Sequence, residues 1–119
     1  MAPVYAVPKL LEKAGLKLQD FDFYEIHEAF ASQVLATLAA WEKNGLGTID
    51  RAKLNVNGSS LAAGHPFAAT GGRIVATLAK LLDHERSGDE RSARGRGGGR
   101  GLISICAAGG QGVVAVMEK

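Results

Sequence analysis

The sequence has few of the features that mark secreted, membrane-bound or nucleic-acid-binding proteins. Its 119 residues include one cysteine, so no internal disulfide can form. No apolar run approaches the roughly 20 residues of a membrane-spanning helix. The residues after Met1 lack a basic stretch leading into an apolar run, so no secretory signal is predicted. These absences predict a cytoplasmic protein without a membrane span.

The composition predicts one folded domain over residues 1–119. A net charge of +2 is too small to imply a general nucleic-acid or membrane partner. A hydrophobic content of 46% is enough for a core in a chain of this length.

Hydrophobic periodicity predicts an α/β fold. Three segments carry apolar residues at helical spacing: Pro3–Ala14, Glu28–Trp41 and Ala68–Leu82. Three short apolar or alternating runs predict strands: Phe21–Ile26, Leu102–Ile105 and Val113–Met117. Within the second helix, four large residues are expected in the core: Phe30, Val34, Leu38 and Trp41.

Two segments between these elements lack periodicity. A short extended piece, Leu54–Val56, leads into a loop of small residues that ends at Gly64. Residues 84–101 are rich in arginine and glycine and predict a mobile surface loop. The stretch Gly95–Gly101 is similar to arginine-glycine tracts that bind RNA, but it is short, lacks aromatic residues and is offset by nearby acidic residues. No nucleic-acid partner is predicted.

A cysteine and a histidine stand in contexts that favour acid/base chemistry. Cys106 follows an apolar run and opens a glycine-rich turn, which backbone or ligand can approach closely. His65 precedes Pro66, which restricts the backbone that aims the imidazole ring. Each has a simpler alternative, because a lone cysteine is often a small core residue and a His-Pro pair is often only a loop. The histidines and the cysteine are not clustered in sequence, so no metal site is predicted.

Three motifs, in this order and spacing, resemble the C-terminal end of the thiolases, enzymes that make or cleave 3-ketoacyl-CoA. They are His27-Glu28-Ala29-Phe30-Ala31, the stretch from Asn55 to Gly71 around Gly64-His65-Pro66, and Cys106-Ala107-Ala108-Gly109-Gly110. The first carries histidine where many thiolases have asparagine, a form similar to the trifunctional-enzyme type of thiolase.

The resemblance implies a role for each chemical group. His65 would be the general base for a nucleophilic cysteine, and neutral imidazole suits that role because its reference pKa is about 6.5. Cys106 would be a second acid/base that moves the α-carbon proton, and His27 would donate, directly or through water, to the enolate oxygen. The oxyanion and substrate loop would comprise Asn57, Gly64, Ala108, Gly109 and Gly110.

The resemblance also implies that the chain is only part of a thiolase. The nucleophilic cysteine of the family belongs to an N-terminal half and is absent here, so the chain alone is predicted to be inactive. The expected fold is an incomplete C-terminal domain, a mixed sheet with helices that lacks its first two strands. Coenzyme A thioesters would be the substrates, without a covalently bound cofactor, and an N-terminal thiolase half or a second copy would be the partner. The alternative is a non-catalytic remnant that binds acyl-CoA or a partner protein.

Overall fold

A computed structural model describes residues 2–66, 69–87, 99–107 and 111–118. Its centre is a three-stranded mixed sheet formed by β1 (Phe23–Ile26), β2 (Arg100–Ala107) and β3 (Gln111–Glu118). The strand order is β1-β2-β3, with β1 parallel and β3 antiparallel to β2. The predicted α/β class, the mixed sheet and the three strands are confirmed for these residues.

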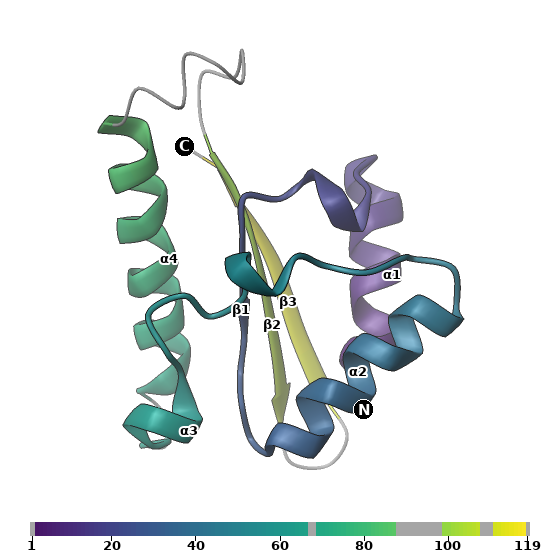
Figure 1. Ribbon diagram of the computed structural model, residues 1–119, viewed down its shortest axis with the longest axis horizontal. Helices are drawn as coiled ribbons and strands as arrows, with labels where there is room; N and C mark the ends of the chain where they lie inside the picture. Colours follow the sequence, from purple (N-terminus) through teal and green to yellow (C-terminus); the bar gives the residue numbers. More distant parts are fainter. Residues whose placement is uncertain (1, 67–68, 88–98, 108–110, 119) are drawn as a thin grey trace.

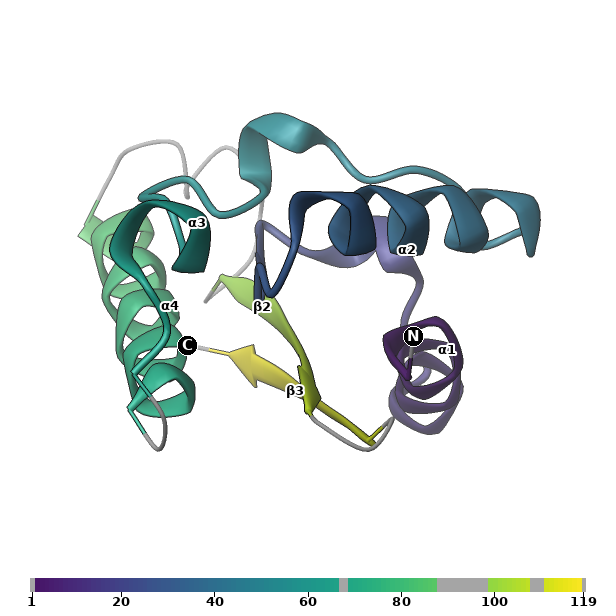
Figure 2. The same ribbon diagram turned by 90° about the horizontal axis from the view of Figure 1, so that it is seen from below.

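Helices cover both faces of the sheet, which gives three layers (Figures 1 and 2). One face packs against α1 (Pro3–Ala14) and α2 (Ala31–Lys43), and the other against α4 (Thr70–Ser87). Three short elements complete the chain: the 3-10 helices Leu18–Asp20 (η1) and Arg51–Lys53 (η2), and the single-turn helix α3 (Ser60–Ala63).

Helix α1 has the bounds that its sequence predicts. Pro3 opens it, where a missing backbone N–H costs no helical hydrogen bond. Gly15 ends it in the left-handed conformation, at φ 68°, and donates its N–H to the carbonyl of Glu12. Trp41 of α2 is fully buried and donates its indole N–H to the carbonyl of Pro3 at 3.2 Å. This bond joins α2 to the start of α1.

The close approach of α4 to the sheet depends on a glycine in β2. Gly101 lies beneath Leu78, and a Cβ added to this glycine would lie 2.4 Å from Leu78 Cδ1. Leu78 is fully buried with Ile74, Leu82 and Ile103 in the smaller of two apolar clusters.

Asn55 closes the outer edge of β1. Its backbone, at φ 46°, donates N–H to the carbonyl of Tyr24 at 2.8 Å. Its side-chain amide then accepts from the N–H of Ile26 and donates to the Ile26 carbonyl, both at 2.9 Å. Leu54 forms an isolated parallel bridge with Tyr24. The segment Leu54–Val56, which the sequence predicts to be extended, therefore lies beside β1 where a further strand would pair.

Several predicted boundaries differ from the structure. Helix α2 begins at Ala31 rather than Glu28, because the chain stays extended through Phe30 as it leaves the sheet. Phe30 is consequently 71% exposed and is not a core residue, whereas Val34 and Trp41 are buried as expected. Strand β1 begins at Phe23 instead of Phe21, although Phe21 is buried in the core.

The predicted loops also differ at their ends. The loop of small residues contains α3, and the predicted loop 84–101 is shorter than its range. Residues 84–87 continue α4, since no glycine or proline interrupts the helix there, and Arg100 and Gly101 already pair in β2. Residues 88–98, and with them most of that predicted loop, lie outside the described residues.

Candidate functional site

The candidate site lies at the end of the sheet where parallel strands β1 and β2 both finish. His27 directly follows β1 and donates its backbone N–H to the carbonyl of Ser104 at 2.9 Å. Cys106 stands two residues further along β2, paired with Gly112 of β3. The carboxyl ends of adjacent parallel strands therefore bring the chain segments of His27 and Cys106 to one edge of the sheet.

The imidazole of His27 is buried and anchored by a serine. The residue is 3% exposed, and its Nδ1 lies 2.8 Å from Oγ of Ser60, the first residue of α3. Burial lowers the pKa of His27, and the nearby charges of His65 and Arg73 lower it further. The site therefore favours the neutral ring of His27.

His65 lies beside His27, with ring centroids 4.4 Å apart and planes tilted by 44°. It follows Gly64, whose φ of 87° is a conformation that other residues rarely adopt. The Nδ1 of His65 lies 2.6 Å from Oγ1 of Thr70, the first residue of α4, and that hydroxyl donates to the carbonyl of Pro66 at 3.3 Å. His65 is exposed, so a reacting group can reach it.

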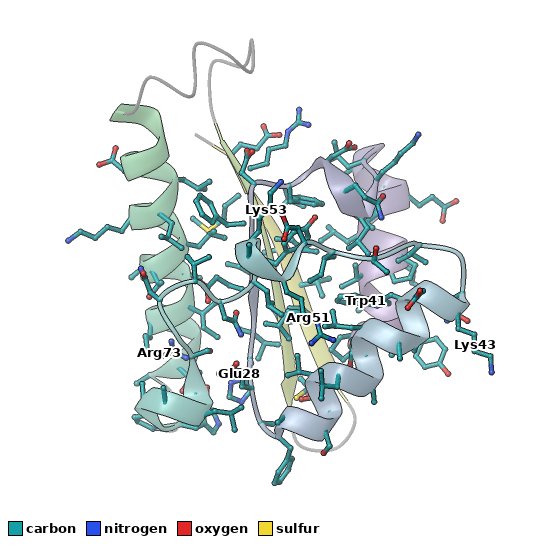
Figure 3. All side chains as sticks on the ribbon, viewed as in Figure 1. Glu28, Trp41, Lys43, Arg51, Lys53 and Arg73 are labelled. Atoms are coloured by element: carbon teal, nitrogen blue, oxygen red, sulfur yellow. The ribbon has the colours of Figure 1, made fainter. Side chains whose placement is uncertain are left out.

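A charged group from α4 is linked to His27 through the hydroxyl of Ser60. Arg73 donates from Nη2 to the hydroxyls of Ser59 and Ser60, at 3.2 and 3.3 Å. Figure 3 shows Arg73 on α4, facing the end of β1 where Glu28 stands. Glu28 in turn accepts the backbone N–H of Leu61 at 3.3 Å.

A second carboxylate, Glu25 of β1, is fully buried. Neither of its oxygens has a hydrogen-bond partner among the described residues. Burial raises the pKa of Glu25 to about 7, with Glu28 adding to the increase and Arg73 opposing it. A carboxyl group that holds its proton near neutral pH thus lies within the electrostatic reach of Arg73.

The structure brings together some of the predicted site residues and leaves others apart. His27 and His65 are in contact. Cys106 is a free, half-buried cysteine inside β2, which continues to Ala107, so it precedes the glycine turn instead of opening it. Asn57 is exposed in the turn before α3. Ala108, Gly109 and Gly110 lie outside the described residues.

The sequence analysis did not single out four side chains that surround the histidines: Glu25, Ser60, Thr70 and Arg73. Glu25 carried a signal, because an acidic residue in an otherwise apolar strand needs an explanation. Ser60 and Thr70 lie within the second motif, but their partners follow only from how α3 and α4 pack against the end of β1, and Arg73 carried no signal.

Neither a metal site nor a membrane-spanning helix is found in the part of the chain that the structure describes. No group of three or more histidine, cysteine or acidic side chains is arranged to hold a metal ion there. None of the helices in that part is both long and apolar enough to cross a membrane.

Comparison with known proteins identifies the family. The thiolase C-terminal domain matches the chain over residues 1–119. The chain belongs to the thiolase family. A 3-ketoacyl-CoA thiolase of Shewanella baltica (strain OS185) is 44% identical over 129 residues, which cover 99% of this chain and 27% of that thiolase. The chain therefore spans about a quarter of the length of this relative.

Solved thiolase structures share the fold. The peroxisomal 3-ketoacyl-CoA thiolase of Saccharomyces cerevisiae, a five-layered α-β-α-β-α structure with two core domains of identical topology, superimposes with a TM-score of 0.77. It is 38% identical, and the match covers 98% of this chain and 29% of the yeast chain. A second structure, of the dimeric peroxisomal thiolase of the same yeast, gives a TM-score of 0.74 at 38% identity, covering 97% of this chain and 25% of that one.

Proposed function

We propose that this chain supplies the acid/base half of a thiolase site that transfers acyl groups to and from coenzyme A. The observation that carries the proposal is the pair His27 and His65, which come from different motifs and lie with ring centroids 4.4 Å apart. The relatives at 44% and 38% identity are named 3-ketoacyl-CoA thiolases. The substrate class proposed for the site is therefore a 3-ketoacyl-CoA or acetoacetyl-CoA thioester.

Each group has a proposed step. His65, which is exposed, takes the proton of a cysteine thiol that attacks the thioester carbonyl. The acyl group passes to that cysteine, and coenzyme A leaves as its thiol with the proton of Cys106, which remains as a thiolate. In the synthetic direction, the Cys106 thiolate removes the α-carbon proton of a second acyl-CoA. His27 stabilises the enolate oxygen by donating a hydrogen bond, and the new carbon–carbon bond forms as the cysteine thiolate leaves and regains its proton from His65. In thiolysis the same steps run in reverse. The loop of Asn57, Gly64, Ala108, Gly109 and Gly110 is proposed to hold the thioester.

The nucleophilic cysteine is proposed to come from an N-terminal thiolase half, because Cys106 is the only cysteine of this chain and has another role. The chain alone is then inactive. The partner half can be a separate chain, and a second copy of this chain can add a dimer contact, as the dimeric yeast thiolase does. The trifunctional-enzyme subtype and the cytoplasmic location stay predictions.

A reconstitution experiment tests this function. The chain is mixed with a thiolase N-terminal half that carries the nucleophilic cysteine, and cleavage of acetoacetyl-CoA by free CoA is followed. We expect activity from the mixture and from neither part alone. His65→Ala should reduce the rate of the mixture by at least about 100-fold, as loss of a general base usually does.

The matched control is His84→Ala, a histidine of α4 outside the site. It should leave the rate within about twofold of the unchanged mixture, since a substitution far along α4 from His65 rarely alters a site. Activity that survives His65→Ala would contradict the role of His65 as base.

The alternative is a non-catalytic module that binds a partner protein. A pocket of about 200 Å³ beside α2 favours it, because its wall includes Leu35 and Leu61, which are 49% and 59% exposed. Binding of the N-terminal half without any thiolysis would support this alternative.

A further inference from the structure

We propose that the hydroxyls of Ser60 and Thr70 impose opposite tautomers on the two adjacent imidazoles, so that neutral His27 carries its proton on Nε2 and neutral His65 carries it on Nδ1. Neither hydroxyl is placed in contact with substrate, so both are positioning residues. The inference deepens the proposed function and rests on it for its chemical purpose. It stands on hydrogen-bond geometry that can be measured without any turnover.

The direction of the Ser60 hydroxyl follows from its second partner. Arg73 has only donors, and its Nη2 lies 3.3 Å from Ser60 Oγ. Ser60 therefore accepts from Arg73 and keeps its own proton for an acceptor. The Nδ1 of His27, 2.8 Å away, is that acceptor. A neutral ring that accepts at Nδ1 carries its proton on Nε2, so His27 can donate from Nε2.

The surroundings of His27 also keep its ring neutral. Arg73 and His65 face it as cationic or potentially cationic groups, and burial at 3% exposure opposes a second ring proton. Glu28 is the group that acts in the other direction. A neutral ring is required, since a doubly protonated imidazole has no tautomer to select.

The Thr70 hydroxyl has the opposite direction. It donates to the carbonyl of Pro66 at 3.3 Å, and a carbonyl can only accept. The hydroxyl has one proton, and with that proton on the carbonyl we infer that its 2.6 Å contact with His65 is a bond donated by the ring Nδ1–H. Neutral His65 then has its lone pair on Nε2, where a general base needs it.

Two chemically identical side chains thus receive different roles from their neighbours. His27 becomes a hydrogen-bond donor and His65 a proton acceptor, although the rings are only 4.4 Å apart. The two roles differ because the Ser60 hydroxyl accepts from Arg73, whereas the Thr70 hydroxyl donates to the carbonyl of Pro66.

Nuclear magnetic resonance of the ring nitrogens tests the inference. The chain has three histidines. When it is labelled with ¹⁵N in histidine and bound to an unlabelled thiolase N-terminal half, it gives three sets of ring signals, and His84→Gln removes one of them. At a pH where both site rings are neutral, we expect an unprotonated Nδ1 in His27 and an unprotonated Nε2 in His65. Ser60→Ala should shift His27 toward a mixture of tautomers without changing His65, and Thr70→Val should do the reverse.

Conservative and neighbouring variants separate this role from general loss of structure. Ser60→Thr and Thr70→Ser keep a hydroxyl and should restore the unchanged spectrum. Ser59→Ala removes the neighbouring hydroxyl that Arg73 also binds, and should leave both tautomers as they are. If Ser60→Ala does not fold, the ring-nitrogen signals of the unchanged chain still show whether His27 and His65 have opposite tautomers.

The same tautomer in both rings of the folded assembly, or a mixture of tautomers at both, would overturn the inference. So would an unchanged His27 signal in a folded Ser60→Ala chain. The result is independent of the reconstitution experiment. Opposite tautomers without thiolysis would reject the proposed function alone, and thiolysis with identical tautomers would reject this inference alone.

Discussion

Glu25 places a carboxyl group in a part of the interior that offers it no hydrogen bond among the described residues. Its raised pKa means that the folded chain holds this proton more tightly than the unfolded chain does. The stability it contributes is therefore fully present below its ordinary value of 4.5 and is lost as pH rises through about 7. His27 acts in the opposite sense, because its lowered pKa makes stability fall as pH drops below its ordinary value of 6.5.

The variant Glu25→Gln isolates the first effect, because glutamine resembles the protonated carboxyl at every pH. We expect the free energy of unfolding to match the unchanged chain at about pH 4 and to exceed it by up to about 3 kcal/mol at about pH 8. The His27 contribution is common to both proteins and cancels. The difference is measured by urea unfolding of the chain bound to its N-terminal half. The fluorescence of the single tryptophan of this chain reports the unfolding.

Glu42→Gln on the exposed face of α2 is the matched control for this comparison. It should leave the pH dependence of the unchanged chain in place. Equal pH dependence in Glu25→Gln and the unchanged chain would show that Glu25 is ionised in the fold at neutral pH.

At the scale of elements, the position of α4 is set by its contact with β2. The missing side chain of Gly101 lets Leu78 approach the strand, and α4 carries both Thr70 and Arg73 to the histidines. The geometry of the candidate site therefore depends on a contact far along the same helix.

Gly101→Ala tests this contact. The added methyl would lie 2.4 Å from Leu78 Cδ1, and a fully buried leucine has little room to move. We expect a loss of about 1–3 kcal/mol in the free energy of unfolding, as is usual when a packed core is overfilled. Gly72→Ala on α4 is the control, since nothing lies within 4 Å of the added atom. It should be neutral or stabilising by up to about 1 kcal/mol.

The sequence predicted elements well where local chemistry decides them. Pro3 and Gly15 bound α1 because each suits its helix end whatever the rest of the chain does. The sequence does not predict the start of α2, since Phe30 is extended where the segment leaves the sheet for the helix. Leu54–Val56 was expected to be extended, but the closure of β1 by Asn55 needs an uncommon positive φ that no periodicity indicates.

The candidate site shows the same division. His27 and His65 were found through their motifs, and the structure brings their rings together. Ser60, Thr70 and Arg73 could not be found, because a hydroxyl gains its role only when two other elements supply its partners. The catalytic roles themselves stay predictions until the reconstitution is done.

At the scale of the whole molecule, the two outer strands differ. The outer edge of β1 is bonded to Asn55, whereas no strand of the described residues pairs with the outer edge of β3. Val113 on β3 is 60% exposed. An unpaired strand edge is a template for pairing with another chain.

We therefore expect the purified chain to melt broadly as a monomer and to melt cooperatively when the N-terminal half or a second copy is bound. Circular dichroism at several protein concentrations, with sedimentation to give the oligomeric state, measures this. Val113→Lys should weaken self-association by adding a charge at the open edge, while Val75→Lys on the exposed face of α4 should not. A sharp, concentration-independent transition of a monomer would contradict the expectation.

The amide of Asn55 has a further consequence for how such chains can assemble. A sheet with two open edges can add strands at both sides and grow without limit into a fibre. Here the amide occupies the hydrogen-bonding groups of Ile26 that a strand approaching β1 would need. Addition is left to the β3 side, where two copies can meet edge to edge and form a closed pair. We therefore expect edge-to-edge assembly of this sheet to stop at two chains, because one asparagine side chain occupies the other edge.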